Sequence, residues 1–374
     1  MKSFSRILAD SSILFGIVWA LVLSCWLDTP TADAQVSIRI TNSSSDDVSP
    51  AWDPTSETIA YLHSQFGSGY PYNIYQTQSV PGSPELPLFE GPALGFGPAF
   101  SPAWIGFTKF LACYESISVP EYLFINTALG PTQRTIPDGP EQTFFPAVFS
   151  DANNSGGYVR FSRDGSTMIV REVDAFGGAR LRSASIFDVL FSPILPIPLS
   201  GFGVVQLNAI PGSGNFFDQG VALSPDGSVF VASLPIFGSD GPHDLWLFST
   251  DASTTPINLT NNAIFGVWNV TPDIAPDGTG IVFSRWSGVP GESFDLYGID
   301  LSGAITHITN TPFFNEYAPS WAPDGLRIAY QGAHFSGFES QFPALFPGES
   351  ANGNLYTLQV RELRSVAPNL VPNL

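Results

Sequence analysis

The stretch "SWAPDG" at residues 320–325 and its near-copies elsewhere in the chain decide the fold. Proline presets φ, aspartate bonds to its own backbone and glycine accepts a positive φ, so Pro-Asp-Gly between β-prone residues predicts a hairpin turn. The runs that follow two of the copies, "GIVFSR" at 280–285 and "RIAYQG" at 327–332, are typical of strands. The repeated stretch is therefore expected to be structural.

The copies are spaced by 47 to 62 residues, and about four short strands fit into each interval. Such a period is typical of a β-propeller with four antiparallel strands in each blade, so six copies predict six blades. In the second copy Ala103-Trp104 stands where Asp-Gly is expected, and the third could instead be registered on Phe149-Ser150-Asp151. The six copies are Trp52-Asp53-Pro54, Phe100-Ser101-Pro102, Phe161-Ser162-Arg163-Asp164-Gly165, Leu223-Ser224-Pro225-Asp226-Gly227, Ile274-Ala275-Pro276-Asp277-Gly278 and Trp321-Ala322-Pro323-Asp324-Gly325.

The two ends of the repeat region complement each other. "RITN" at 39–42 matches "HITN" at 307–310, which is the outer strand before the next blade, whereas "NLYTLQV" at 354–360 matches a third strand. The last blade therefore lacks a fourth strand, and residues 36–41 are predicted to supply it. This arrangement would close the propeller without open sheet edges.

The repeats resemble the WD-like blades of the TolB propeller family, in which a Ser-Pro-Asp-Gly turn links the two inner strands. The resemblance covers residues 36–363 and implies a six-bladed propeller. TolB itself also carries an N-terminal α/β domain, for which this chain has no room. The resemblance is therefore to the propeller, and it does not identify the chain as TolB.

Composition agrees with an all-β globular protein. The 374 residues are 44% hydrophobic and only 13% charged, with 35 Gly, 33 Pro and 31 Phe. The formal net charge is −19, which repels phosphate backbones and argues against a nucleic-acid partner or an anionic membrane surface. We expect a monomer that binds a protein partner.

The N-terminus predicts export. Lys2 and Arg6 precede an apolar run at 13–23, and Ala32-Asp33-Ala34 is typical of a cleavage site. An alternative to cleavage is lipidation at Cys25. We expect the protein in the periplasm or outside the cell. No second apolar run approaches the roughly 20 residues of a membrane span, so the mature chain should lack one. The predicted segments are a signal peptide at 1–34, the propeller at 35–364 and a C-terminal tail at 365–374.

The links between blades should reach nearest the propeller axis, on the same end as the longer loops. The residues five positions before the start of the repeated motifs, together with two aromatic neighbours, are predicted to form an acidic rim around the axis at this end. Carboxylate and amide oxygens on an axis could hold Ca²⁺, although no metal ligands are identified and no cofactor is expected. The competing interpretation is that these side chains bond to local backbone. The predicted rim residues are Asp47, Asp218, Trp268, Asn269, Glu316 and Tyr317.

No catalytic motif is found in the sequence. Gly-x-Ser-x-Gly, His-Glu-x-x-His and Walker patterns are absent, and the histidines are scattered. His63 and His334 each follow the second strand, in the first and last blades, which should be adjacent after closure. We interpret them as ordinary loop histidines, with a metal-binding pair as the alternative. The leading hypothesis is an exported, non-catalytic protein-binding module. The alternative is a propeller enzyme, a lyase or hydrolase of sugar or ester substrates, with a divalent metal at the axis.

Overall fold

The regular secondary structure of the described part of the chain is almost entirely β-strand. It contains one short 3-10 helix, η4 (Ala263–Phe265), and no α-helix, as the all-β prediction requires. None of its helices is long and apolar enough to cross a membrane. The chain divides into Met1–Gln35 and Val36–Leu374, and every described residue belongs to the second unit. The computed structural model describes residues 37–64, 72–90, 102–104, 110–115, 121–126, 132–133, 143–146, 155–173, 179–185, 220–236, 241–334 and 353–360.

Three of the predicted features lie outside the described residues. They are the signal peptide at 1–34, the alternative lipidation site Cys25 and the tail at 365–374. These remain predictions from the sequence.

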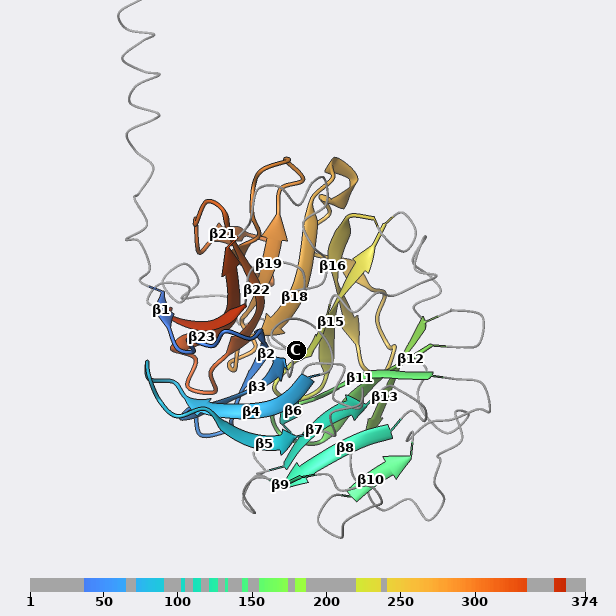
Figure 1. The fold of residues 1–374 in the computed structure, drawn as a ribbon. Helices are drawn as coiled ribbons and strands as arrows, with labels where there is room; N and C mark the ends of the chain where they lie inside the picture. The colour runs from blue at the N-terminus through green and yellow to red at the C-terminus, as the bar shows by residue number, and fades with distance from the viewer. Residues whose placement is uncertain are drawn as a thin grey trace, which may run out of the picture. The chain divides into compact units, whose positions relative to one another are not determined.

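Successive stretches of the chain fold into sheets whose neighbouring strands mostly follow one another in sequence (Figure 1). Tight turns allow this, because antiparallel strands can be joined by very short connections. The first three sheets have the orders β2-β3-β4-β5-β9, β6-β7-β8-β10 and β11-β12-β13. Their strands are β2 (Asp47–Trp52), β3 (Thr58–Ser64), β4 (Tyr72–Gln78), β5 (Leu86–Glu90), β6 (Ala103–Trp104), β7 (Phe110–Glu115), β8 (Glu121–Asn126), β9 (Thr132–Gln133), β10 (Thr143–Pro146), β11 (Ser155–Phe161), β12 (Thr167–Val173) and β13 (Ala179–Ser185).

The remaining three sheets have the orders β14-β15-β16-β17, β18-β19-β20-β21 and β22-β23-β24-β1. The last of them confirms the predicted closure, because the N-terminal strand β1 pairs antiparallel with β24, joining Ile38 to Thr357 and Arg39 to Tyr356. The strands are β14 (Val221–Leu223), β15 (Val229–Pro235), β16 (His243–Ser249), β17 (Ile257–Asn258), β18 (Trp268–Ile274), β19 (Gly280–Trp286), β20 (Asp295–Asp300), β21 (Ile305–His307), β22 (Phe314–Trp321), β23 (Arg327–His334), β24 (Asn354–Gln359) and β1 (Ile38–Arg39).

The first strand of each sheet contacts the first strand of the next. β2 contacts β6, β6 contacts β11, β11 contacts β14, β14 contacts β18 and β18 contacts β22. β22 in turn contacts β2, so the inner strands form a closed ring. Apolar side chains fill the space between neighbouring sheets. Trp52 and Ile59 of the first sheet, for example, share a core cluster with Ala322 and Ala329 of the last. The chain is thus an all-β propeller.

The number of complete blades differs from the prediction. Five sheets contain at least four strands, rather than the six four-stranded blades that the sequence predicted. The other sheet, β11-β12-β13, has three strands in the part of the chain that the structure describes. The first sheet has a fifth strand, β9. This strand lies in sequence between β8 and β10 of the second sheet, but it pairs parallel with β5 of the first.

The repeated turns are structural, as predicted; three of the four that end in glycine read Pro-Asp-Gly, and one has Arg163 in place of the proline. Each turn glycine has a φ of +68° to +73°, a conformation that residues with a Cβ rarely adopt. The N–H of each donates to the carbonyl three residues before, at 2.8–3.0 Å. The aspartate before it accepts the N–H of the residue two positions on, as Asp226 does from Ser228. The four glycines are Gly165, Gly227, Gly278 and Gly325.

The inner strands share a second device, a bulge before a proline. Ser49, Thr271 and Ala318 have positive φ values of +49° to +55°, and the pairing of β2, β18 and β22 with the next strand shifts register there. A bulge of this kind bends the strand and re-aims the side chains before it. In β2, β18 and β22, the residues before the bulge therefore pair in a different register from the residues after it.

The second copy of the repeat was aligned wrongly. Ala103–Trp104 is the inner strand β6, whereas the alignment of Phe100-Ser101-Pro102 placed the turn at these residues. The identical "SPAW" at 49–52 and 101–104 gives the correct correspondence, in which Pro102 matches Pro50 rather than Pro54. The indole Nε1 of Trp104 donates to the carbonyl of Ala51 at 3.2 Å, which ties these two inner strands together.

Candidate functional site

The predicted rim residues lie at or near the beginning of inner strands. Asp47 begins β2, Trp268 and Asn269 begin β18, and Glu316 and Tyr317 lie near the start of β22. All five are buried, with exposed fractions from 0% for Asp47 and Asn269 to 8% for Tyr317. Asp218 lies outside the described residues. The described members of the predicted rim are thus buried side chains.

Asn269 ties its inner strand to the preceding sheet. Its side-chain Nδ2 donates to the carbonyl of His243 at 2.8 Å and to Oδ1 of Asn262 at 2.7 Å. Its own carbonyl accepts the hydroxyl of Ser233 at 2.7 Å. These bonds join β18 to β15 and β16, so Asn269 has a structural role at this junction.

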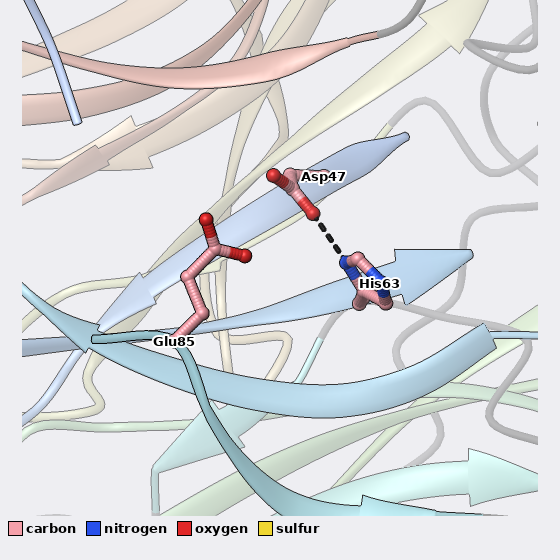
Figure 2. A group of neighbouring side chains, drawn as sticks. All are labelled: Asp47, His63 and Glu85. Atoms are coloured by element: carbon pink, nitrogen blue, oxygen red, sulfur yellow. Dashed lines mark hydrogen bonds and ion pairs between the residues drawn. The ribbon is translucent and has the colours of Figure 1, made fainter. Parts of the chain in front are cut away.

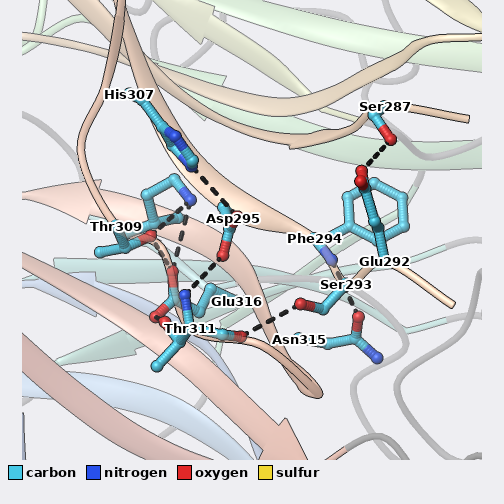
Figure 3. Close-up of polar contacts among 11 residues, drawn as sticks. Ser287, Glu292, Ser293, Phe294, Asp295, His307, Thr309, Thr311, Asn315 and Glu316 are labelled. Atoms are coloured by element: carbon cyan, nitrogen blue, oxygen red, sulfur yellow. Dashed lines mark hydrogen bonds and ion pairs between the residues drawn. The ribbon is translucent and has the colours of Figure 1, made fainter. Parts of the chain in front are cut away.

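Glu316 has the equivalent role one sheet later (Figure 3). Its carboxylate accepts the hydroxyls of Thr309 and Thr311, the latter at 2.8 Å, and the N–H of Leu296 at 3.3 Å. Burial raises the pKa of Glu316 to about 7, and the two threonine hydroxyls only partly offset this. The carboxyl therefore changes its charge near neutral pH while it is enclosed by its partners.

A threonine before each of three inner strands explains why "ITN" and "LTN" recur. The hydroxyls of Thr41, Thr260 and Thr309 accept the N–H of a leucine in the third strand of the preceding sheet, at 2.8–3.0 Å. Each of these bonds satisfies a buried donor where the chain passes to the next sheet. The recurring polar residues are thus needed for the blade junctions.

The aromatic members of the predicted rim pack against each other. Trp268 and Tyr317 belong to one buried cluster with Trp286 and Phe294, and the rings of Phe294 and Tyr317 are 4.4 Å apart. His243 lies against Trp268, with ring centroids 5.0 Å apart, and burial lowers the pKa of His243 to about 4. This histidine is therefore neutral at physiological pH.

Asp47 is part of a different arrangement, shown in Figure 2. Its Oδ1 lies 2.7 Å from Nδ1 of His63, on the adjacent strand β3. Glu85, which precedes β5, offers a carboxylate to the same group, and one ligand atom from each of the three residues lies within 4.8 Å of the others. Asp47 is fully buried, whereas His63 and Glu85 are partly exposed. We call Asp47, His63 and Glu85 the carboxylate–histidine group.

This group lies where the first and last sheets meet. The N–H of Asp47 donates to the carbonyl of Gly353 at 2.9 Å, and the N–H of Gly353 donates to Oδ1 of Asp46 at 2.7 Å. Burial raises the pKa of Asp47, and its hydrogen bond to His63 opposes that effect. Two ligand types, carboxylate and imidazole, thus meet at the closure of the ring.

No protein-family model and no curated protein matches the chain. Among solved structures, TolB from Acinetobacter baumannii is similar with a TM-score of 0.51 at 14% identity, over 82% of this chain and 64% of that one. This chain thus spans less than two thirds of that TolB. The chain has a TolB-like fold.

Two further structures are similar to this TolB-like propeller. A putative TolB from Agrobacterium tumefaciens has a TM-score of 0.42 at 12% identity, covering 87% of this chain and 91% of that one. Regucalcin, a calcium-binding protein from the same species, has a TM-score of 0.48 at 10% identity, covering 87% and 94%. At these identities the likeness concerns the fold alone.

Sequence reasoning did not find the carboxylate–histidine group of this TolB-like propeller. His63 was interpreted as an ordinary loop histidine, whereas it pairs with Asp47 across β2 and β3. The side chain of His334, which was expected near it, lies outside the described residues. Glu85 follows the third strand of the first sheet, and no motif in the sequence connects it with Asp47.

Proposed function

We propose that this chain is an exported protein-binding module that holds its partner on the end of the sheets where the links between successive blades lie. The observation that supports this is a set of large apolar side chains exposed on neighbouring loops of that end. Isolated exposed apolar residues are common, but a group of them is typical of an interaction surface. We call the set Ile264, Phe265, Val289 and Phe313 the loop patch.

The loops that carry the patch contact one another. Ile264 and Phe265 lie in η4, between β17 and β18, and a side chain at Gly288 would collide with the backbone of Gly266. The β19–β20 loop with Val289 therefore lies directly against this link. On its other side, the hydroxyl of Ser293 donates to the carbonyl of Thr311 at 3.1 Å, two residues before Phe313. One blade thus brings all three segments together.

Phe313 gives a second reason for binding. Its side chain is 62% exposed, and its φ of +62° is a left-handed conformation that is costly for a bulky residue. Glycine would suit this position better if folding alone mattered. Strained and exposed residues of this kind are frequent at binding sites. We therefore place Phe313 in the contact with the partner.

The charge of the chain indicates the chemistry of the partner. With a net charge of −19, and with the exposed Glu292 beside the patch, the surface attracts cationic groups. We infer that the partner is a protein segment in which apolar side chains alternate with Lys or Arg. Its binding should weaken as salt is raised, because exposed charges are screened.

Capture from an envelope extract of the source organism tests the proposal. Wild type is compared with Phe265→Ser/Phe313→Ser and with Leu301→Ser, a control whose exposed side chain lies in the β20–β21 turn at the opposite end of the same blade. Removing aromatic anchors from an interface commonly costs 2 kcal/mol or more, so we expect about tenfold or greater loss of the purified partner's affinity in the patch variant only. Equal affinity of all three proteins would refute the proposal.

We also infer that β11-β12-β13 is the inner part of a sixth blade. Its first strand contacts β6 on one side and β14 on the other, as an inner blade strand would. A monomeric, exported six-bladed propeller then accounts for the six copies of the repeat and for the N-terminal signal pattern. Mass spectrometry of the protein recovered from the organism tests cleavage after Ala34 against lipidation at Cys25.

A further inference from the structure

The carboxylate–histidine group brings three potential ligands together from three segments of one sheet. Asp47 begins β2, His63 lies near the end of β3 and Glu85 precedes β5, and one donor atom of each lies within 4.8 Å of the other two. The group combines one imidazole nitrogen with two carboxylates. This donor set is suited to a divalent ion of the first transition series.

A second observation points independently to a bound cation. Asp47 is fully buried, and while Oδ1 bonds to His63, Oδ2 has no hydrogen-bond partner among the described residues. A buried carboxylate oxygen without a donor is costly, and such atoms are rare in folded proteins. A cation between Asp47 and Glu85 would satisfy this oxygen and would balance two neighbouring negative charges.

The neighbours of the group hold its outer members in place. The hydroxyl of Tyr61 donates to Oε2 of Glu85 at 2.9 Å, which leaves the other oxygen of that carboxylate available. The ring of His63 packs on Tyr75, with centroids 4.5 Å apart. Residues that fix the orientation of ligands in this way strengthen metal sites.

We propose that Asp47, His63 and Glu85 bind one divalent transition-metal ion, with Zn²⁺ as the representative ion. Zn²⁺ takes nitrogen and oxygen ligands at about 2.0–2.2 Å, so the ligand atoms would rearrange around it and the 2.7 Å contact between His63 and Asp47 would open. Water completes the coordination on the exposed side of His63. Ca²⁺ is disfavoured, because it takes oxygen ligands and would not use the imidazole.

The position of the group gives the ion a structural effect. The N–H of Asp47 donates to Gly353, and the N–H of Gly353 donates to Asp46. Because Gly353 directly precedes β24, the ion would stabilise the contact between β2 of the first sheet and β24 of the last. An ion that binds the folded chain and not the unfolded one raises stability by mass action. Zn²⁺ should therefore raise the melting temperature of the chelator-treated protein.

The test uses the full chain, treated with chelator and then titrated with Zn²⁺ or Co²⁺. Zinc stoichiometry is measured by mass spectrometry after dialysis, cobalt binding by visible absorption, and stability by thermal melts. The variants are His63→Ala and Glu85→Gln, and the glutamine keeps an acceptor for Tyr61. His307→Ala is the matched control, because Nε2 of His307 lies 3.1 Å from Asp295 in a comparable pair.

We expect one zinc ion in wild type and in His307→Ala, and affinity at least about tenfold lower in His63→Ala and Glu85→Gln, with loss of the zinc-dependent rise in melting temperature. Near-UV circular dichroism of the metal-free proteins establishes that both variants fold. Failure of wild type to retain zinc would overturn the proposal. Zinc retained in both folded variants, or Ca²⁺ binding that needs Glu85 but not His63, would overturn it as well.

Discussion

Replacing Glu316 by glutamine should change how the stability of the protein depends on pH. Burial raises the pKa of Glu316 to about 7 in the folded chain from an ordinary value of 4.5. Between these two pH values the folded chain keeps a proton that the unfolded chain has released. The contribution of Glu316 to the free energy of unfolding is therefore most favourable below pH 4.5, and it falls as the pH rises to about 7.

The size of the effect follows from the raised pKa. A tenfold change in proton affinity corresponds to about 1.4 kcal/mol, so Glu316 should weaken the folded state by about 3 kcal/mol between pH 4.5 and 7. Glutamine has nearly the same shape and stays neutral. Its oxygen can accept from one threonine hydroxyl, and its amide can donate to the other. We therefore expect Glu316→Gln to be more stable than wild type by roughly 1–3 kcal/mol at pH 8, with little difference at pH 4.5.

Urea unfolding followed by tryptophan fluorescence at pH 4.5, 6, 7 and 8 measures this difference. The control is Glu57→Gln, which makes the same chemical change at an exposed glutamate. The free-energy difference between wild type and Glu316→Gln should grow with pH, whereas that of the control should stay constant. A difference for Glu316→Gln that did not change with pH would refute the assignment of a buried, proton-binding carboxyl.

Three further changes test other parts of the structure. Burial lowers the pKa of His243 to about 4, so wild type should lose up to about 3 kcal/mol as the pH falls from 6.5 to 4; His243→Phe should show a flatter acid limb in the same urea assay. Phe313→Gly should raise stability by about 1 kcal/mol in thermal melts, because it relieves the left-handed backbone, and a lower melting temperature would contradict this. Arg327 donates to the carbonyl of Ser56 at 2.6 Å and to Ser79 at 2.7 Å across the ring closure, so Arg327→Met should cost about 1–3 kcal/mol in urea unfolding; an unchanged midpoint would show that these bonds contribute little.

The fold could be predicted because its signals are local and repeated. The residue types of the Pro-Asp-Gly turns predict their backbone geometry. The match between "RITN" at 39–42 and "HITN" at 307–310 predicted which strand closes the ring. The pairing of β5 with β9 could not be predicted in this way. It joins segments of two different blades, and parallel pairing has no turn between its strands from which to infer the register.

The site was harder to predict because position along the repeat does not say what a side chain contacts. Asp47, Asn269 and Glu316 occupy equivalent places, yet Asn269 and Glu316 bond to the preceding sheet and its link, whereas Asp47 also bonds to His63 of its own sheet. The sequence contains the threonines that enclose Glu316, but their role becomes visible only when the sheets are packed. Glu85 joins the group through tertiary contact alone.

The pairing of β1 with β24 also sets an order of assembly. β1 is synthesised long before β24, so it finds its partner late, across a loop of roughly 300 residues whose closure costs about 5 kcal/mol. Until then both β1 and the edge of the last sheet present unpaired N–H and C=O groups, which are prone to join other chains. A chain cut short before Asn354 keeps both edges open permanently. Formation of β24 therefore removes two open sheet edges through which the chain could aggregate.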